Sequence, residues 1–303
     1  MTADYYRKKT TDLLNNVEMP RSSGYTTALR NIGSIRNSGF ELQLDGRIID
    51  RAVKWDLGVN FSLNRSKVLV LSEDKDIFGG ELDNTILKDQ LNLMRVGEPM
   101  YVFYGYVEDG YDENGHIVYK NMDDDPAITA ADKTIIGDPN PDFLVNLTTA
   151  VSYKGFTLSA FFQSSIGNDI YSLSMAAQAY DYGYNGKTLR EVYYNHWTLE
   201  NPTAKYPNLD QTSYKMSDRF VYDGSFVRLK NLELAYDVPC ARSKFIKRAR
   251  VYVSAQNLFT ITSYPFWDPD INANGGGSSM IQGVDSYCYP SARTYTIGCR
   301  LTF

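Results

Sequence analysis

Apolar and polar residues alternate along the last stretch of the chain, Thr294 to Phe303. Tyrosine, isoleucine, cysteine, leucine and phenylalanine occupy the odd positions, and threonine, glycine and arginine occupy the even ones. An extended strand places these two sets on opposite faces. The strand is long enough to cross the hydrocarbon core of a bilayer at a tilt, and it ends on an aromatic residue. This pattern fits the closing strand of an outer-membrane barrel, and it also fits the last strand of a soluble sandwich.

The same alternation recurs along the whole chain. Trp55 to Asn64 alternates without an error, and Phe143 to Tyr153 leads through the turn Lys154-Gly155 into a returning strand. Between Leu229 and Leu232 the apolar positions change phase, which predicts a β-bulge. With the closing strand, these segments predict about eight antiparallel strands. The segments are residues 4–12, 39–48, 55–64, 143–153, 156–162, 226–236 and 250–260.

Long polar insertions separate the predicted strands at one end only. The connections after residues 12, 65, 165 and 261 are long, whereas those after residues 49, 153 and 236 are short or of medium length. The extracellular loops and periplasmic turns of outer-membrane barrels alternate in this way. This alternation of long and short connections requires that the predicted strand Tyr101 to Val107 belongs to an insertion and is not one of the strands of the barrel wall. A helical turn is expected near residues 188–197.

Composition narrows the classes of protein that remain. The formal net charge of -5 gives no broad basic surface, which disfavours nucleic-acid binding. The 24 Tyr and 22 Gly fit a β-rich protein with aromatic belts or a stacking surface. No apolar run is long enough for a membrane-spanning helix, and Met1 to Leu14 lacks the apolar core of a signal peptide. Because a barrel protein must be exported, we expect these residues to be the C-terminal part of a longer protein.

Catalysis and disulfide bonding find little support in the sequence. The two histidines, His116 and His196, lie in predicted loops without a neighbouring nucleophile or metal-ligand spacing. The three cysteines are far apart and odd in number, so they give no disulfide framework. We therefore expect that the protein is not an enzyme.

Six blocks of sequence carry a specific resemblance that covers nearly the whole chain. The blocks are NIGSIRNSGFELQLDG (Asn31 to Gly46), IIGDPNPDF (Ile135 to Phe143), HWTLENPTAKYP (His196 to Pro207), DGSFVRLKNLELAYDVP (Asp223 to Pro239), VYVSAQNLFTIT (Val251 to Thr262) and YPSARTYTIGCRLTF (Tyr289 to Phe303). In order and spacing they resemble the C-terminal barrel of the SusC/RagA family of TonB-linked outer-membrane transporters from Bacteroidetes.

The resemblance implies an all-β fold. It would be an antiparallel transmembrane β-barrel segment with long extracellular loops, made of about eight C-terminal strands from a barrel of about 22 strands. Residues 1–303 would be the C-terminal part of the barrel, without the plug domain and the N-terminal strands. The implied location is the cell outer membrane, in contact with its lipid. The implied function is import of oligosaccharides or peptides, driven by the TonB complex through the missing N-terminal region and aided by a SusD-like surface lipoprotein.

Two other classes of protein stay open beside the transporter. A soluble or surface-anchored β-sandwich could bind glycans through its aromatic loops, with the apolar strand faces as its core. A small autonomous outer-membrane barrel could have a structural role. In the transporter interpretation, the apolar faces of Trp55 to Leu63, Phe143 to Tyr153 and Tyr295 to Phe303 point toward lipid. Arg300 then points inward, because in lipid it would cost about 2 to 4 kcal/mol near the midplane.

Aromatic residues suggest two separate roles. Those in the insertions could stack on sugar rings or bind a peptide, or they could pack the loops against one another or against a capping lipoprotein. This set is Tyr180, Tyr182, Tyr184, Trp197 and Trp267. Those near predicted strand ends are expected to form an interfacial girdle. The girdle set is Trp55, Tyr153, Tyr236 and Tyr252.

One acidic segment has the spacing of a Ca²⁺-binding loop. Asn121, Asp123, Asp125 and Asp132 occupy positions 1, 3, 5 and 12 of the pattern, which supplies hard oxygen ligands. The segment departs from the pattern twice, because Pro126 replaces the turn glycine and position 12 lacks the longer glutamate. A bound Ca²⁺ is therefore one hypothesis for this extracellular loop, and a solvated acidic loop is the alternative that the departures favour. No other cofactor is expected.

Overall fold

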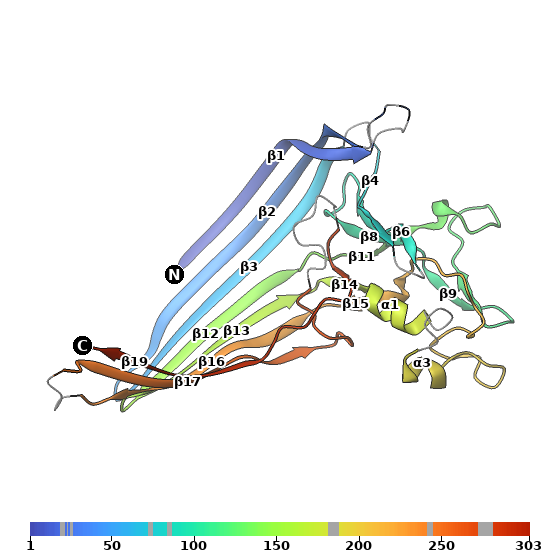
Figure 1. Cartoon of the computed structure of the whole chain (residues 1–303). Coiled ribbons are helices and arrows are strands. Elements are labelled where there is room, and N and C mark those ends of the chain that lie inside the picture. The colour runs from blue at the N-terminus through green and yellow to red at the C-terminus, as the bar shows by residue number, and fades with distance from the viewer. Residues whose placement is uncertain are drawn as a thin grey trace.

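The computed structural model describes residues 1–18, 22, 24, 27–71, 75–83, 87–180, 188–240, 245–271 and 281–303. Eight long strands form one curved antiparallel sheet, and a body of loops lies at one end of it (Figure 1). Among the residues described, each long strand pairs only with the long strands next to it in chain order, which makes an up-and-down wall and confirms the predicted strand count. The strands are β1 (Thr2–Glu18), β2 (Thr27–Asp50), β3 (Val53–Leu71), β12 (Phe143–Tyr153), β13 (Phe156–Ile166), β16 (Phe226–Val238), β17 (Arg248–Thr262) and β19 (Thr294–Thr302).

The connections at the two ends of the wall differ in length. At one end, residues 51–52 join β2 to β3, and Lys154-Gly155 joins β12 to β13. Both residues of this second turn have positive φ, 47° and 88°, as a tight hairpin turn between twisted strands requires. The chain termini lie toward this end (Figure 1). The short-turn end is thus the predicted periplasmic end.

Three long insertions leave the wall at the opposite end. We call residues 72–142, 167–225 and 263–293 the first, second and third insertions. The prediction of a long connection after residue 12 is wrong, because β1 continues to Glu18 and β2 begins at Thr27. The pairing of these two strands continues through register shifts near Leu13, which the weak alternation of this segment did not reveal.

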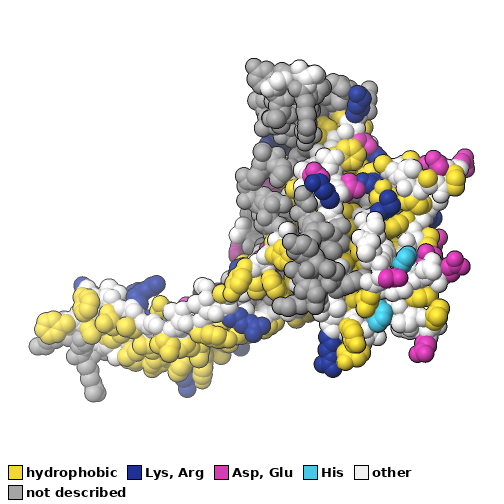
Figure 2. All heavy atoms as spheres, turned by 45° about the vertical axis from the view of Figure 1, so that its right-hand side comes forward, with side chains coloured by type: hydrophobic (Ala, Val, Ile, Leu, Met, Phe, Trp, Pro, Cys, Tyr) yellow, Lys and Arg dark blue, Asp and Glu magenta, His cyan; other side chains and the backbone are white. Residues whose placement is uncertain are grey.

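The two faces of the wall have opposite character. A row of directly paired apolar residues crosses seven strands: Ile49, Trp55, Val151, Leu158, Leu234, Val253 and Ile297. The adjoining row on the other face is mostly polar: Arg47, Asp56, Ala150, Ser159, Glu233, Ser254 and Thr296. We call these faces outer and inner. Figure 2 shows hydrophobic side chains gathered along one side of the wall, at the lower left.

The outer face is exposed, which decides against the sandwich alternative. Leu158 and Val253 are each 47% exposed, and Ile297 is 86% exposed. In the part of the chain that the structure describes, no second sheet covers these side chains. A sandwich would bury them as its core. The outer face carries the three apolar faces predicted to meet lipid, and Arg300, opposite Arg250, lies on the inner face as predicted.

The predicted β-bulge is present in β16. Pairing with β13 passes from Leu229 directly to Asn231, so Lys230 is the extra residue. Pairing with β17 shifts at the same place. The bulge explains the change of phase in the sequence, because it lets Leu229 and Leu232 both face outward although three positions separate them.

One member of the predicted aromatic girdle is on the wrong face. Tyr252 pairs with Gly298, and its ring would lie 2.4 Å from a Cβ added at that glycine. Both residues are on the inner face, because the phase of β17 turns Val253 outward. The tyrosine therefore covers a glycine inside the wall, and the girdle prediction is wrong for it. Tyr153 and Tyr236 face outward, beside the turn that follows β12.

The three insertions fold together into one body with its own hydrophobic core. The core takes Phe103 from the first insertion, Tyr171 and Ala176 from the second, and Val284 from the third. Its elements are β4 (Ile77–Phe78), β5 (Glu81–Asp83), β6 (Lys88–Gln90), β7 (Asn92–Met94), β8 (Val102–Gly105), β9 (Glu108–Tyr111), β10 (Ile117–Tyr119), β11 (Thr134–Gly137), β14 (Asp169–Ser172), α1 (Leu173–Tyr180), α3 (Arg190–Tyr194), β15 (Val221–Asp223) and β18 (Val284–Asp285).

Two predictions for the insertions are confirmed. Strand β8 lies within the predicted strand 101–107 and belongs to the loops, and α3 lies within the predicted helical turn. Helix α1 was not predicted, because its eight residues are almost all buried and so show no amphipathic period. Among the described residues, no helix is long and apolar enough to span a membrane.

Candidate functional site

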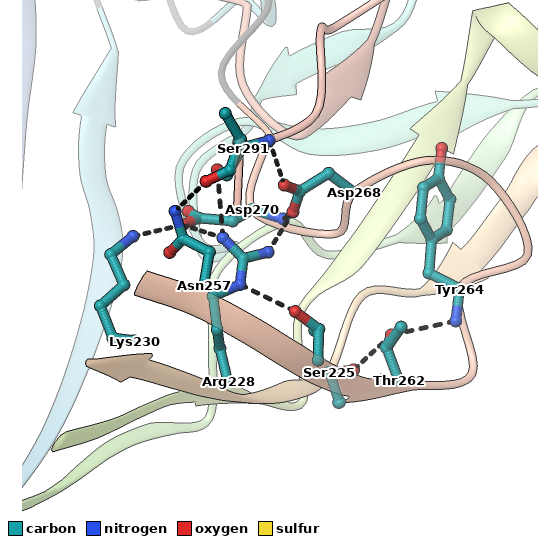
Figure 3. A network of polar contacts seen from close by, with 11 residues as sticks. Ser225, Arg228, Lys230, Asn257, Thr262, Tyr264, Asp268, Asp270 and Ser291 are labelled. Carbon is teal, nitrogen blue, oxygen red and sulfur yellow. Dashed lines mark hydrogen bonds and ion pairs between the residues drawn. The ribbon is translucent and has the colours of Figure 1, made fainter. Parts of the chain in front are cut away.

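The side chain of Arg228 connects the inner face of the wall to the third insertion (Figure 3). Arg228 lies on β16 and is only 1% exposed. Its Nε donates to Thr260 Oγ1 at 2.9 Å, and its Nη1 donates to Ser291 Oγ at 3.2 Å. The guanidinium also pairs with Asp268, and Nη1 lies 3.3 Å from Asp270 Oδ2. We call these five residues the Arg228 cluster.

The carboxylate of Asp268 is stabilised in its ionised form. Burial would raise the pKa of this group, but hydrogen bonds from the amides of Ser291 and Asp270 and from Arg228 outweigh burial and hold the pKa below its usual range. The two amide nitrogens lie 2.9 Å from the carboxylate oxygens. The cluster has one arginine and two aspartates, and Lys230 Nζ, 3.9 Å from Asp270 Oδ2, supplies the second positive charge. These contacts hold the third insertion against the wall.

Further buried contacts join the insertions to one another. Arg219 of the second insertion donates from Nε to Glu108 Oε2 of the first at 2.7 Å. Tyr264 of the third insertion donates to Asp285 Oδ2 at 2.6 Å and lies 2.9 Å from Ser172 Oγ of the second. Asp285 is 1% exposed. These contacts make the loop body a single packed unit above the inner face.

Two cavities lie between the inner face of the wall and this loop body. The smaller has a volume of about 260 Å³, and its lining includes Asn146 and Gln163 of the wall. The larger has a volume of about 520 Å³, and its lining includes Trp267. Pro269 borders both cavities, between the two aspartates of the Arg228 cluster. We call them the amide cavity and the tryptophan cavity, and together they form the candidate site.

Two of the five aromatic candidates lie inside the loop core. Tyr180 is 4% exposed and stacks on Tyr214, with ring centroids 3.9 Å apart. Trp197 is 8% exposed, and a Cβ added at Gly115 would come within 2.2 Å of its ring. Both rings pack loops together, which is the alternative role that the sequence left open.

The other three aromatic candidates have different positions. Trp267 is 55% exposed, stacks on Phe266 with ring centroids 4.8 Å apart, and borders the tryptophan cavity. Tyr182 and Tyr184 lie outside the described residues. Substrate contact by any of the five residues stays a prediction, and Trp267 is the one whose described position suits it.

The acidic segment of the first insertion uses its side chains to order its own backbone. Asn121 Oδ1 accepts from the amide of Asp123 at 3.1 Å, and Asp123 Oδ1 accepts from the amide of Asp125 at 2.8 Å. The carboxylate of Asp132 accepts from the amides of Met122 and Thr129, each at 2.7 Å, which lowers its pKa.

These four predicted ligands are not gathered around one point. In the described part of the chain, no group of three or more His, Cys, Asp or Glu side chains is arranged to hold a metal ion. The arrangement therefore does not fit a Ca²⁺ loop as it stands. Ca²⁺ binding stays a prediction, and calorimetric titration with Ca²⁺ would check it.

The histidine rings contact nearby groups of the loops. His116 Nε2 lies 2.9 Å from Asp210 Oδ1, and His196 Nδ1 lies 2.7 Å from the carbonyl oxygen of Tyr193. Both contacts are exposed; the first joins the first insertion to the second, and the second lies within one segment of the second insertion. This geometry supports packing of the loops.

The sequence did not reveal the Arg228 cluster. An arginine on the polar face of a strand and the acidic turn Trp267 to Asp270 are the available signals. Forty positions separate Arg228 from Asp268, and the alternation of strand residues says nothing about which loop returns to which strand. Only the tertiary fold brings the two charges together.

These features together define the class of protein. A curved up-and-down wall with an exposed apolar outer face, a polar inner face, short turns at one end and packed loops at the other is a section of an outer-membrane β-barrel. A family model described as "TonB dependent receptor-like, beta-barrel" matches residues 1–258, and the chain belongs to that family.

Individual relatives agree with this assignment. TonB-dependent receptor P3 of Formosa agariphila is 32% identical over 100% of this chain and 32% of its own length. TonB-dependent receptor SusC of Bacteroides thetaiotaomicron is 28% identical over 99% of this chain and 30% of its own length. The structure of the RagAB peptide transporter covers 99% of this chain with a TM-score of 0.83 and 27% identity. The chain spans about a third of the length of these relatives.

Proposed function

We propose that this chain is the barrel wall and loop body of a TonB-dependent importer of the outer membrane that takes up oligosaccharides or peptides. The observation that carries the proposal is the match, over 99% of the chain, to a structure named for peptide transport. SusC, a TonB-dependent receptor, is a further relative. The relatives that match are named as receptors or transporters, so we propose transport and not catalysis.

The two edge strands and the exposed apolar residues of the loop body indicate the partners that we propose. Strands β1 and β19 are the two edges of the sheet, and in a bilayer their free backbone groups require further strands to close a barrel. Energy from the TonB complex would enter through a region outside these residues. A SusD-like lipoprotein would cover the loop body, where Tyr193, Tyr194 and Leu199 are between 59% and 85% exposed.

Uptake by the complete protein tests this proposal. The gene would be deleted in the source organism, and uptake of fluorescent neutral oligosaccharides, acidic oligosaccharides and peptides would be compared with the wild type. We expect uptake of one of these classes to fall to background, and to fall equally when TonB is removed. Unchanged uptake of every class, or uptake that does not depend on TonB, would contradict the proposal.

A further inference from the structure

Three side-chain amides form a line across the inner face of the wall, just below the loop body. Asn60 on β3 pairs with Asn146 on β12, which pairs with Gln163 on β13. Adjacent strands are about 4.8 Å apart, so the three groups repeat at that spacing. We call these three residues the amide row.

None of the three amide groups forms a hydrogen bond or ion pair with another residue that the structure describes. The Oδ1 atom of Asn146 is buried and has no partner, which is a costly state for a polar group. The residues that flank the row, on β2 and β16, do have hydrogen-bond partners. Gln43 donates to Asp45 Oδ2 at 2.7 Å, and Arg228 is held by its cluster. The row therefore contains hydrogen-bonding groups without a partner among the described residues, and none of its three side chains is charged.

The amide cavity borders two of the three residues of the row. Asn146 and Gln163 line one side of it, and the insertions close it from above through Pro139, Pro141 and Pro269. The strands that carry the row are each paired on both sides, so the main chain of a peptide cannot join the sheet there. The wall can therefore contact a ligand there only through its side chains. Asp169 and Asp270 also line the cavity, and both carboxylates already have partners, the amide of Asp138 at 2.8 Å and the guanidinium of Arg228 at 3.3 Å.

The chemistry of the row indicates the class of ligand. A carboxamide presents both donors and an acceptor, and a hydroxyl group is likewise donor and acceptor. We propose that the amide row and the amide cavity bind the hydroxyl groups of a neutral oligosaccharide on its way through the barrel. This inference rests on the proposed import function, and it assigns the substrate class at that site.

Binding and uptake by the full-length transporter, with its lipoprotein, test the inference. The probes are neutral oligosaccharides of glucose, mannose, galactose and xylose, with uronic-acid oligosaccharides and peptides of similar length for comparison. We expect Asn146→Ala and Gln163→Ala each to weaken binding of the neutral ligand about three- to tenfold, and the double variant at least tenfold. The matched control is Ser159→Ala, on the same strand and the same face as Gln163, which should stay within about twofold of the wild type.

A second variant separates binding from folding. Gln163→Glu keeps the volume and the acceptor of the side chain but removes its donor, and we expect the same weakening. The folded fraction of each variant is measured from heat-modifiable migration of the barrel in gels. Equal affinity of the folded variants and the wild type would overturn the inference. Energised uptake of peptides or acidic oligosaccharides alone would overturn it while leaving the importer intact, whereas no energised uptake would overturn the proposed function itself.

Discussion

Replacing Arg228 with alanine is expected to detach the third insertion from the wall. The variant leaves Asp268, which is 7% exposed, without its positive partner. Breaking a buried pair by removing one partner costs about 3 to 5 kcal/mol, because the remaining charge is buried alone. We expect the free energy of local unfolding of the third insertion to fall by this amount. Hydrogen exchange of residues 263–271 in the full-length protein would measure it.

Two controls separate this effect from a general loss of charge. Lys230 lies 3.9 Å from Asp270 at a partly exposed position, so Lys230→Ala should cost less than about 1 kcal/mol. The double variant Arg228→Met with Asp268→Leu should recover much of the loss, because neither charge is then buried alone. Unchanged exchange in Arg228→Ala would contradict a fastening role for the Arg228 cluster.

An arginine at position 297 is expected to lower the stability of the folded barrel by about 2 to 4 kcal/mol. Ile297 belongs to the outer row, opposite Val253, and is 86% exposed on the face assigned to lipid. A charged side chain at this position must move from water into the hydrocarbon core of the bilayer. Equilibrium unfolding of the full-length barrel in lipid vesicles would measure the change.

The neighbouring residue supplies the matched control. Thr296 pairs with Ser254 on the inner face, and an arginine there would remain on the polar side of the wall. We expect Thr296→Arg to change stability by less than about 1 kcal/mol. Equal destabilisation by the two variants, or a larger effect at position 296, would show that the faces are assigned the wrong way round.

The wall could be predicted from the sequence because each strand carries its own evidence. Alternation with a period of two fixes both the extent of a strand and its two faces, as in β12 and β19. Even the bulge at Lys230 left a local signal, the change of apolar phase around it. The weak points were strands without clean alternation, so β1 appeared shorter than it is and the face of Tyr252 was missed.

Apart from Trp267, the candidate site could not be predicted, because its contacts join residues far apart in the chain. Arg228 meets Asp268 across 40 positions, and in the adjoining loop body Glu108 meets Arg219 across 111. For the same reason the sequence left two roles open for the aromatic residues in the insertions. Whether a ring such as Tyr180 faces a ligand or a loop core depends on how three insertions pack, which no local pattern records.

The two faces of β19 allow a direct test that these strands form the wall of an outer-membrane barrel. Single cysteines at positions 296 and 297, in a full-length protein whose Cys240, Cys288 and Cys299 are replaced by serine, would carry spin labels in lipid vesicles. Collisions with oxygen, which concentrates in lipid, and with a water-soluble nickel chelate would be compared. We predict that oxygen reaches the label at position 297 and that the label at position 296 is shielded from lipid. The reverse pattern, or equal access of the water-soluble reagent to both labels, would contradict the barrel assignment.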